Sequence, residues 1–158
     1  MVLLISGSTR GGSTNTAALR TVQAVAPEGI EARWYGGLAE FSLKNLLDWT
    51  VGTGDLNAKP AAWLTVAPPG RGDGAAATLA SVLGYVGAEV DEAICTRLPL
   101  SRTDIGGDGL VVSPEFRAGA TEVLLAGLRH RQAGRRQLLG RREPARPGRA
   151  GYRGRFAR

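Results

Sequence analysis

Apolar and polar positions alternate along the chain in blocks that predict strands and helices in turn. Residues 2–5 form an apolar run, a polar stretch occupies 6–16, and residues 17–25 place apolar side chains at helical spacing. A short run of β-branched and leucine residues is typical of a buried parallel strand. We therefore expect a strand, a loop and a helix in succession, with Ser13 or Thr14 as the N-cap of the helix.

The same alternation continues as far as residue 128. Residues 30–35 alternate apolar and polar side chains, which predicts a second strand near a sheet edge. The later elements that the pattern predicts are helices at 42–51 (capped by Ser42), at 75–86 and from Ser113-Pro114-Glu115, a strand at 60–67 and a last strand contained within 88–95. Strands that alternate with helices predict an α/β fold, in which a parallel sheet carries helices on both faces.

The segment between the second strand and the next helix is too short for a complete doubly wound sheet. Only six residues, 36–41, separate Tyr35 from Ser42. One more strand and its crossover helix would need about 30 residues. We therefore expect one central strand and one helix to be missing. The two strands that would flank the missing one must then pair directly or leave an open edge, and we expect reduced stability.

The loop after the first strand is rich in hydroxyl groups and glycine, and it contains one arginine. Backbone N–H groups and the helix dipole favour an anion at such a strand-to-helix loop. The glycine spacing matches neither the dinucleotide-binding motif nor the P-loop. Hydroxyl groups with one arginine suit a terminal monophosphate better than a bridging pyrophosphate. From the residues alone, an anion site and a merely polar turn remain equally open.

A second glycine-rich loop, Pro68-Pro69-Gly70-Arg71-Gly72-Asp73-Gly74, follows the predicted strand at 60–67. Ligands of open α/β sheets bind at the carboxyl ends of the strands, so this loop is a second candidate for ligand contact. Arg71 is either a ligand for a cofactor phosphate or an exposed loop cation.

Two segments resemble the NADPH-dependent FMN reductase family. Ile5-Ser6-Gly7-Ser8-Thr9-Arg10-Gly11-Gly12-Ser13-Thr14-Asn15 is similar to the family's N-terminal signature, commonly S-G-S-x-R-x-x-S-x-N. Ser42-Leu43-Lys44-Asn45-Leu46-Leu47-Asp48-Trp49 resembles the second half of the family's T-P-E-Y-x-x-x-x-P-G-x-L-K-N-x-L-D-W motif, whose T-P-E-Y half is absent. The resemblance covers residues 1–128 apart from the block missing near 36–42.

This resemblance implies a flavodoxin-like, three-layer α/β/α fold and an NAD(P)H-dependent oxidoreductase. Hydride would pass from NADPH or NADH through bound FMN to a small-molecule acceptor, namely a quinone, a metal ion or free flavin. Carried across by position, the phosphate ligands would be Ser8, Arg10, Ser13 and Asn15, with Thr16 close by. Gly70, Arg71 and Gly74 would belong to the loop beside the flavin. The cofactor performs the chemistry in such enzymes, so no catalytic side chain is assigned.

The missing block bears directly on that function. In the family, the T-P-E-Y loop normally lies against the isoalloxazine ring, so its absence leads us to expect weak flavin affinity. One alternative is a catalytically impaired relative that keeps only the fold or the family's oligomer interface. The resemblance also implies a homo-oligomer, either a dimer or a tetramer, and the three tryptophans are expected to pack against the sheet or a subunit interface: Trp34, Trp49 and Trp63.

Charge divides the chain into a domain at 1–128 and a tail at 129–158. The first part has nine Lys and Arg against thirteen acidic residues, whereas the tail has eleven Arg and one Glu. Arg- and Gly-rich segments bind RNA or anionic surfaces, and Tyr152 and Phe156 are able to stack on bases. A solvated extension unrelated to the domain also accounts for this composition. A shifted reading frame in a GC-rich gene would produce such an extension. We prefer the solvated extension, expect the tail at 129–158 to be disordered or a frayed helix, and do not expect a nucleic-acid partner.

The remaining composition excludes several classes of protein. No run of 18 apolar residues is present, which argues against a membrane span, and the N-terminus lacks the features of a signal peptide. Cys95 is the single cysteine, so we expect a reduced, buried residue in a cytoplasmic protein. No cluster of His, Cys, Asp and Glu has metal-ligand spacing. His130 is the single histidine and lies in the tail, which argues against a Ser-His-Asp hydrolase.

Overall fold

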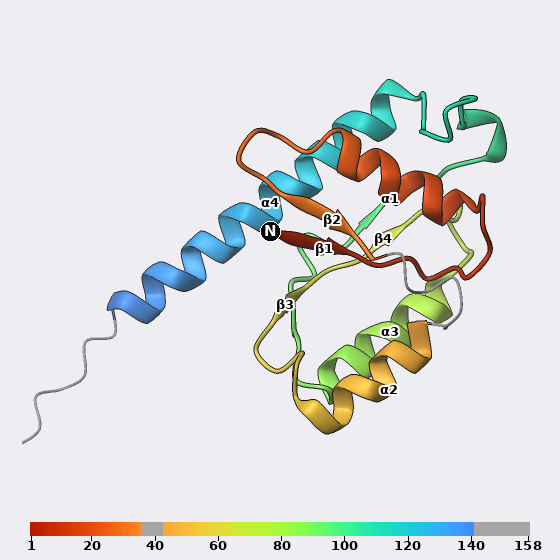
Figure 1. The fold of residues 1–158 in the computed structure, drawn as a ribbon. Helices are drawn as coiled ribbons and strands as arrows, with labels where there is room; N and C mark the ends of the chain where they lie inside the picture. Colours follow the sequence, from red (N-terminus) through yellow and green to blue (C-terminus); the bar gives the residue numbers. More distant parts are fainter. Residues whose placement is uncertain (36–42, 141–158) are drawn as a thin grey trace, which may run out of the picture.

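The computed structural model of the chain describes residues 1–35 and 43–140, in which helices alternate with short parallel strands (Figure 1). The strands are β1 (Val2–Leu4), β2 (Ala32–Trp34), β3 (Pro60–Ala61), β4 (Leu64–Thr65), β5 (Glu89–Val90) and β6 (Thr96–Arg97). The helices are α1 (Thr14–Ala24), α2 (Leu43–Thr53), α3 (Asp73–Tyr85) and α4 (Pro114–Gly140), with a short 3-10 helix η2 (Arg102–Asp104). The α/β class predicted from the pattern is confirmed.

The first βαβ unit has the predicted order. β1 and β2 are parallel, with Val2 beside Ala32 and Leu4 beside Trp34, and α1 connects them. The Ser13 backbone is extended and its Oγ accepts a hydrogen bond from the Thr16 N–H at 3.1 Å, so Ser13 rather than Thr14 is the N-cap. The strand, loop and helix predicted at the start of the chain are therefore confirmed.

The strand predicted at 60–67 is interrupted, and the strand predicted within 88–95 is short. β3 pairs with β5, and β4 pairs with β6, both in parallel. Between β5 and β6 the chain turns, because Asp91 accepts backbone hydrogen bonds from Ile94 through its carbonyl and from Ala93 through its side chain, at 3.1 and 3.0 Å. The strand predicted within 88–95 is present as β5 and ends before Asp91, since this aspartate offers the backbone a local alternative to the ladder. β6, which follows the turn, was not predicted.

β1 and β4 belong to separate strand pairs, and no ladder joins them in the described part of the chain. This is the second of the two outcomes expected from the short 36–41 segment, an open edge rather than direct pairing. Leu3 in the middle of β1 is 52% exposed, so the face of β1 that carries this side chain is not fully covered, unlike the faces of a typical buried parallel strand.

The main hydrophobic core lies where β1, α1 and the first half of α4 meet. Its buried members are Leu4, Ala17, Ala18, Val22, Val66, Leu100, Val111, Phe116, Ala120 and Leu124. One polar side chain lies inside it: Thr21 is fully buried, and its Oγ1 donates to the Ala17 carbonyl and accepts from the Val111 N–H, both at 2.8 Å. This hydroxyl ties α1 to the segment that precedes α4.

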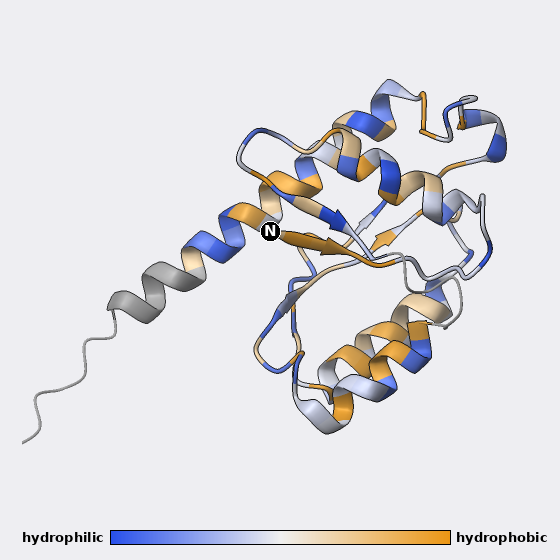
Figure 2. Ribbon diagram, viewed as in Figure 1, coloured by the Kyte–Doolittle hydropathy of each residue, from blue (hydrophilic) through white to orange (hydrophobic). Residues whose placement is uncertain are grey.

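Helices α2 and α3 bury much less of their apolar surface. Each contributes one buried residue, Leu47 or Leu83. Figure 2 shows hydrophobic residues along both helices, and Trp49 and Tyr85 are 78% and 81% exposed. Trp49 therefore does not pack against the sheet within this chain, whereas Trp34 and Trp63 are half-buried.

Helix α4 begins where the sequence predicts and ends later. Ser113 precedes it and accepts a hydrogen bond from the Phe116 N–H at 3.2 Å, with Pro114 as the first helical residue. The helix continues past residue 129 to Gly140, and its second half projects from the body of the molecule (Figure 1). The predicted cap at Ser42, the 36–41 segment and residues 141–158 lie outside the described residues. Among the described helices, none is long and apolar enough to cross a bilayer.

Candidate functional site

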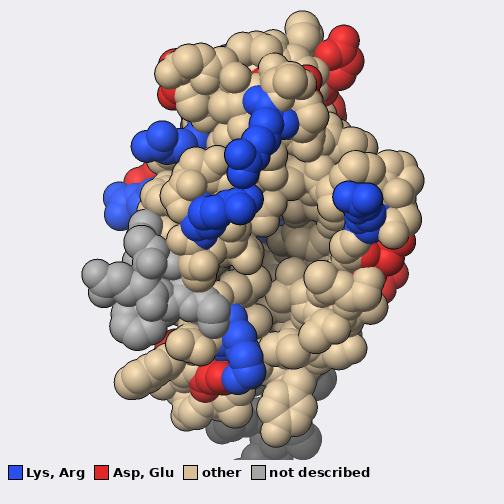
Figure 3. Space-filling model, turned by 90° about the vertical axis from the view of Figure 1, so that its right-hand side faces the viewer, with Lys and Arg blue, Asp and Glu red and all other residues tan. Residues whose placement is uncertain are grey.

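The two predicted ligand loops lie at the carboxyl ends of β1 and β4. The first spans residues 6–13 and leads into α1, and the second spans 66–72 and leads into α3. Both appear on the right-hand side of Figure 1. Figure 3 shows that side of the molecule: its surface is hollowed near the centre, and lysine and arginine side chains lie on several sides of the hollow. This is the side where open α/β sheets hold their ligands.

The first loop is held in shape by its own serines. Ser6 is buried, and its Oγ accepts from the Ser8 N–H at 3.1 Å and donates to the Ser8 carbonyl at 3.2 Å. The Ser8 Oγ in turn accepts from the Arg10 N–H at 3.3 Å. Ser6 has therefore used both its proton and an acceptor lone pair inside the loop. Ser6 therefore shapes the loop, whereas the Ser8 hydroxyl accepts a hydrogen bond and keeps its own proton uncommitted.

Two hydroxyl protons of this loop remain available to a ligand. The Ser8 Oγ accepts a hydrogen bond but donates none among those formed within the described residues. Ser13 and Thr16 share one hydrogen bond of 3.0 Å between their hydroxyl oxygens, and the Ser13 Oγ also accepts from the Thr16 N–H. Whichever of the two hydroxyl groups donates, the proton of the other is not used in this hydrogen bond. A phosphate oxygen is an acceptor, so it complements protons of this kind.

Arg10 and Asn15 complete the predicted set. Arg10 is exposed on the loop, and no ion pair engages its guanidinium among the described residues. Asn15 lies half-buried in the first turn of α1, with its amide nitrogen above Gly7, 3.8 Å from where a Cβ would stand. The structure therefore brings all five predicted phosphate ligands into one loop and the helix turn that follows it.

The electrostatics of the two helix starts differ. The first turn of α1 contains no acidic residue, so its positive dipole end stands beside Arg10 without a carboxylate to offset it. The first turn of α3 contains Asp73, which already places a negative charge at that helix start. The first loop therefore favours an anion and the second does not.

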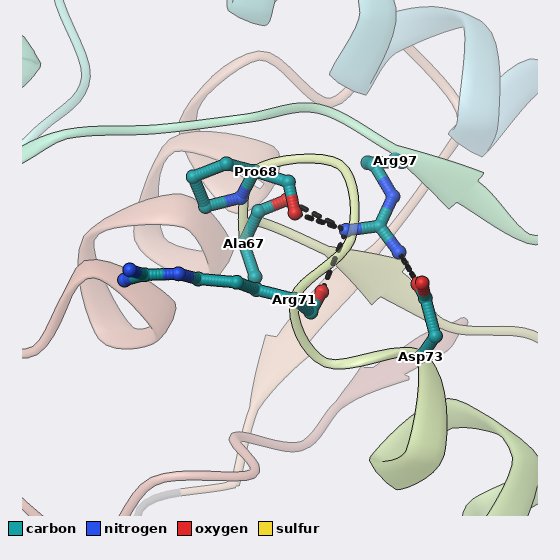
Figure 4. Close-up of polar contacts among 5 residues, drawn as sticks. All are labelled: Ala67, Pro68, Arg71, Asp73 and Arg97. Carbon is teal, nitrogen blue, oxygen red and sulfur yellow. Dashed lines mark hydrogen bonds and ion pairs between the residues drawn. The ribbon is translucent and has the colours of Figure 1, made fainter.

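The second loop is organised around Arg97, which reaches it from β6 (Figure 4). The Arg97 Nη1 donates to the carbonyls of Ala67, Pro68 and Arg71 at 2.8, 2.9 and 2.9 Å. Its Nη2 forms an ion pair with Asp73. One guanidinium thus holds both ends of the loop, and its side chain is only 27% exposed.

The backbone of this loop explains its glycines. The Arg71 N–H donates to the Pro68 carbonyl at 3.1 Å, which closes a turn with Pro69 and Gly70 at its centre. Gly70 has φ +76°, the value that a type II turn requires after proline. Gly72 has φ +81° and forms the N-cap of α3, and a Cβ there would lie 3.5 Å from the Cβ of Ala67. Arg71 points its carbonyl at Arg97, so only its exposed side chain is available to a ligand.

The predicted site residues therefore fall into two groups that the structure does not join. Ser8, Arg10, Ser13, Asn15 and Thr16 form the first group, and Gly70, Arg71 and Gly74 the second. Within the described residues, no hydrogen bond or ion pair links one loop to the other. The resemblance places both beside one cofactor, and that arrangement stays a prediction.

Sequence reasoning missed Arg97. The signal was a lone arginine just after the last predicted strand, beside the apolar Leu98, because a charged side chain among apolar ones needs a partner. It also missed a close polar contact between His130 Nδ1 on α4 and Asp91 Oδ2, 2.7 Å apart, which connects residues far apart in the sequence. Neither contact follows a local spacing rule, so neither was predictable from the pattern alone.

Cys95 and the acidic residues offer little further chemistry. Cys95 is half-buried in the turn after β5, where its Sγ donates to the Asp91 carbonyl at 3.4 Å. Burial raises the pKa of its thiol, with the nearby carboxylates of Asp91 and Glu92 acting in the same direction. The thiol is therefore a poor nucleophile at neutral pH. In the described part of the chain, no group of three metal-ligating side chains gathers.

Comparison with models of protein families found no match to this chain, and comparison with curated proteins found none either.

Proposed function

We propose that the chain is a flavodoxin-like, NAD(P)H-dependent FMN reductase-like oxidoreductase, and that its first loop binds the FMN phosphate. The observation that carries the proposal is the loop at 6–13. It offers uncommitted hydroxyl protons, an exposed arginine and a helix start without acidic residues, all after the first strand of a βαβ unit. The resemblance of the sequence to the family's signature supports the same assignment.

The donor set of the first loop fits a terminal phosphate. Ser8 and the Ser13–Thr16 pair would donate hydroxyl protons to its oxygens, and Arg10 would supply a charge-assisted hydrogen bond. Asn15 would contribute an amide donor from the first turn of α1. Ser6 would keep the loop in shape without touching the ligand, because its proton is already bound to the Ser8 carbonyl.

Bound FMN would supply the redox chemistry, taking hydride from NAD(P)H and passing electrons to a quinone, a metal ion or free flavin. The chain's part is to hold and orient. The loop at 70–74 would flank the flavin ring, and Arg97 would fix its carbonyls away from the ligand. No side chain of the chain is assigned as an acid, a base or a nucleophile.

The missing T-P-E-Y block favours a second candidate, a catalytically impaired relative that keeps the fold or an oligomer interface. Two observations support it. Among the described residues, no strand pairs with the edge of β1 that faces away from β2, and Trp49 is 78% exposed on α2. A homo-oligomer would cover such a residue, and sedimentation of the chain beside its Trp49→Ser variant measures this directly. An equal, monomeric sedimentation coefficient for both would contradict the oligomer.

The decisive test compares FMN with riboflavin, which has the same ring and no phosphate. Fluorescence quenching of each flavin should give tighter binding of FMN to the chain. Arg10→Ala should remove most of that difference, because a hydrogen bond to a charged group contributes about 1.5–3 kcal/mol, or roughly ten- to hundredfold in Kd. Lys59→Ala is the matched control, since Lys59 is an exposed cation that precedes β3 at the opposite end of the strands.

Activity then separates the two candidates. Anaerobic NADPH oxidation that needs both FMN and Arg10 supports the reductase. Arg10-dependent FMN binding without NADPH oxidation supports the impaired relative. FMN and riboflavin that bind equally well, or an Arg10→Ala variant that binds FMN as the parent does, would overturn the phosphate assignment for both.

A further inference from the structure

A groove lies between helix α4 and the segment that connects β5 to β6. Its volume is about 230 Å³, and the residues that line it come from 93–96 and from 119–129. None of them belongs to either loop of the proposed flavin site. Pockets for drug-sized ligands occupy about 300–1,000 Å³. The groove therefore suits a molecule much smaller than a flavin or a nicotinamide cofactor.

Contacts between α4 and the segment 91–98 close the groove at both ends. Beyond one end, His130 Nδ1 lies 2.7 Å from Asp91 Oδ2. The other oxygen of this carboxylate accepts a hydrogen bond from the Ala93 N–H at 3.0 Å, which fixes the wall of the groove. At the opposite end, Gly119 packs so closely on Leu98 that a Cβ would lie 2.8 Å from the Leu98 Cδ2. The groove is therefore held open before any ligand arrives.

The interior of the groove is mainly apolar. Ile94 and Val123 provide its larger aliphatic side chains, and Ile94 is only 8% exposed. Gly119 and Ala126, from the facing side of α4, are small and leave the space unfilled. The Thr96 hydroxyl donates to the Ile94 carbonyl at 3.0 Å, so its proton is not available to a ligand. The interior thus favours an aliphatic group.

Two charges of opposite sign line the same groove on α4. Glu122 Oε2 and Arg129 Nη2 lie 4.0 Å apart, and their side chains are 71% and 65% exposed. An exposed pair at this distance is weak, so each charge remains able to bind a ligand group. Arg129 would attract a simple carboxylate, but Glu122 would repel it. A zwitterion that carries an ammonium and a carboxylate group complements both.

We propose that the groove binds a free α-amino acid with an aliphatic side chain of about the size of leucine. Its carboxylate would pair with Arg129 and its ammonium group with Glu122, while the side chain would pack on Ile94 and Val123. The bound amino acid would tie α4 to the segment 93–96. The proposal does not rest on flavin binding, because no residue of the two loops takes part.

The test is a titration of the full-length chain with L-leucine, followed through the NMR signals of the Ala93, Thr96 and Ala126 amides. Three analogues separate the contributions. Glycine lacks the aliphatic side chain and should bind about tenfold more weakly or worse, since even half of a buried leucine side chain contributes about that factor. 4-Methylpentanoate lacks the ammonium group and 3-methylbutylamine lacks the carboxylate. Each should bind about two- to fivefold more weakly than leucine, as expected for one exposed ion pair.

Two pairs of variants locate the binding site. Ala126→Leu fills the groove and should abolish the leucine-induced shifts, whereas Ala118→Leu places the same side chain at an exposed position of α4 outside the groove. Arg129→Gln should weaken leucine binding about two- to fivefold. Arg131→Gln is its control, because Arg131 donates to the Met1 carbonyl and does not line the groove. Circular dichroism checks that all four variants remain folded.

Three results would overturn the proposal. The first is a leucine titration that leaves the three amide signals unchanged. The second is 4-methylpentanoate that binds as tightly as leucine, since the groove would then select an apolar anion rather than an amino acid. The third is leucine binding that Ala126→Leu and Ala118→Leu affect equally, which would place the ligand elsewhere on the molecule.

Discussion

Replacing Arg97 should loosen the loop that follows β4 and lower the stability of the chain measurably. The guanidinium contacts three carbonyls of that loop and the carboxylate of Asp73. Glutamine at this position keeps part of the apolar stem but loses the positive charge and the forked set of N–H donors of the guanidinium. Arg97→Gln therefore tests whether one side chain organises the loop, as the geometry indicates.

The magnitude follows from the number of hydrogens and from exposure. Nη1 has two hydrogens for three carbonyls, so it forms at most two full hydrogen bonds, each contributing about 1.5–3 kcal/mol when the donor is charged. Pro68 and Arg71 are exposed, so in the variant their carbonyls form hydrogen bonds with water, which offsets part of the lost free energy. The Asp73 side chain is 65% exposed, so its ion pair adds no more than about 1 kcal/mol. We expect a loss of about 2–3 kcal/mol in the free energy of unfolding.

Urea unfolding followed by circular dichroism measures that loss, and hydrogen exchange of the Arg71 amide reports on the loop itself. That amide donates to the Pro68 carbonyl at 3.1 Å, so it should exchange faster once the loop opens. Arg33→Gln is the matched control, because the Arg33 guanidinium pairs with Glu31 across side chains that are 65% and 56% exposed. The control should change stability by less than about 0.5 kcal/mol. Equal urea midpoints for the two variants, with unchanged Arg71 exchange, would refute the reasoning.

Three further predictions follow from single contacts. Thr21→Val should lower the free energy of unfolding by about 1–3 kcal/mol in urea titrations, because it leaves the buried Val111 N–H without an acceptor; an unchanged midpoint would contradict this. Cys95 should react with iodoacetamide more slowly than free cysteine at pH 8, since burial raises the pKa of its thiol, and the difference should narrow as pH rises. The Ser113 hydroxyl donates to the Glu115 carboxylate and lowers its pKa. The ionised carboxylate therefore stabilises the fold above its unfolded pKa of about 4.3, and this stabilisation is lost as the pH falls through the lower folded pKa. Glu115→Gln should therefore destabilise the chain at pH 6 and have little effect at pH 3, and a pH-independent difference would count against the contact.

Local patterns predicted the elements whose causes are local. The apolar run at 2–5 and the serine cap of α1 depend on neighbouring residues, and both were correct in type and position. The interruption of the strand at 60–67 and the additional strand β6 were not predicted. The turn between β5 and β6 depends on how Asp91 uses its side chain and carbonyl, and an alternating pattern contains no information about that choice.

The candidate site divides in the same way. The composition of the first loop pointed to its hydroxyl groups, and all of them lie together because they are adjacent in the chain. The sequence could not tell which hydroxyl groups shape the loop and which are available to a ligand. Ser6 and Ser8 have the same side chain and differ only in their surroundings. Arg97 could not be predicted for another reason. Its partners are distant in sequence, and three of them, at 67, 68 and 71, are backbone carbonyls, which every residue has.

The separation of the strand pairs has a consequence for cooperativity. Among the described strands, β1 pairs with β2, while β3 and β4 pair with β5 and β6, the strands that follow α3 in the sequence, so no ladder joins the two groups. In a continuous sheet, opening one strand exposes its neighbour. Within the described residues, the segments 1–35 and 60–97 are connected by side-chain packing, for example where Leu4 and Val66 enter the same core. Two classes of amide protection, rather than one global opening, are the expected signature of such a molecule.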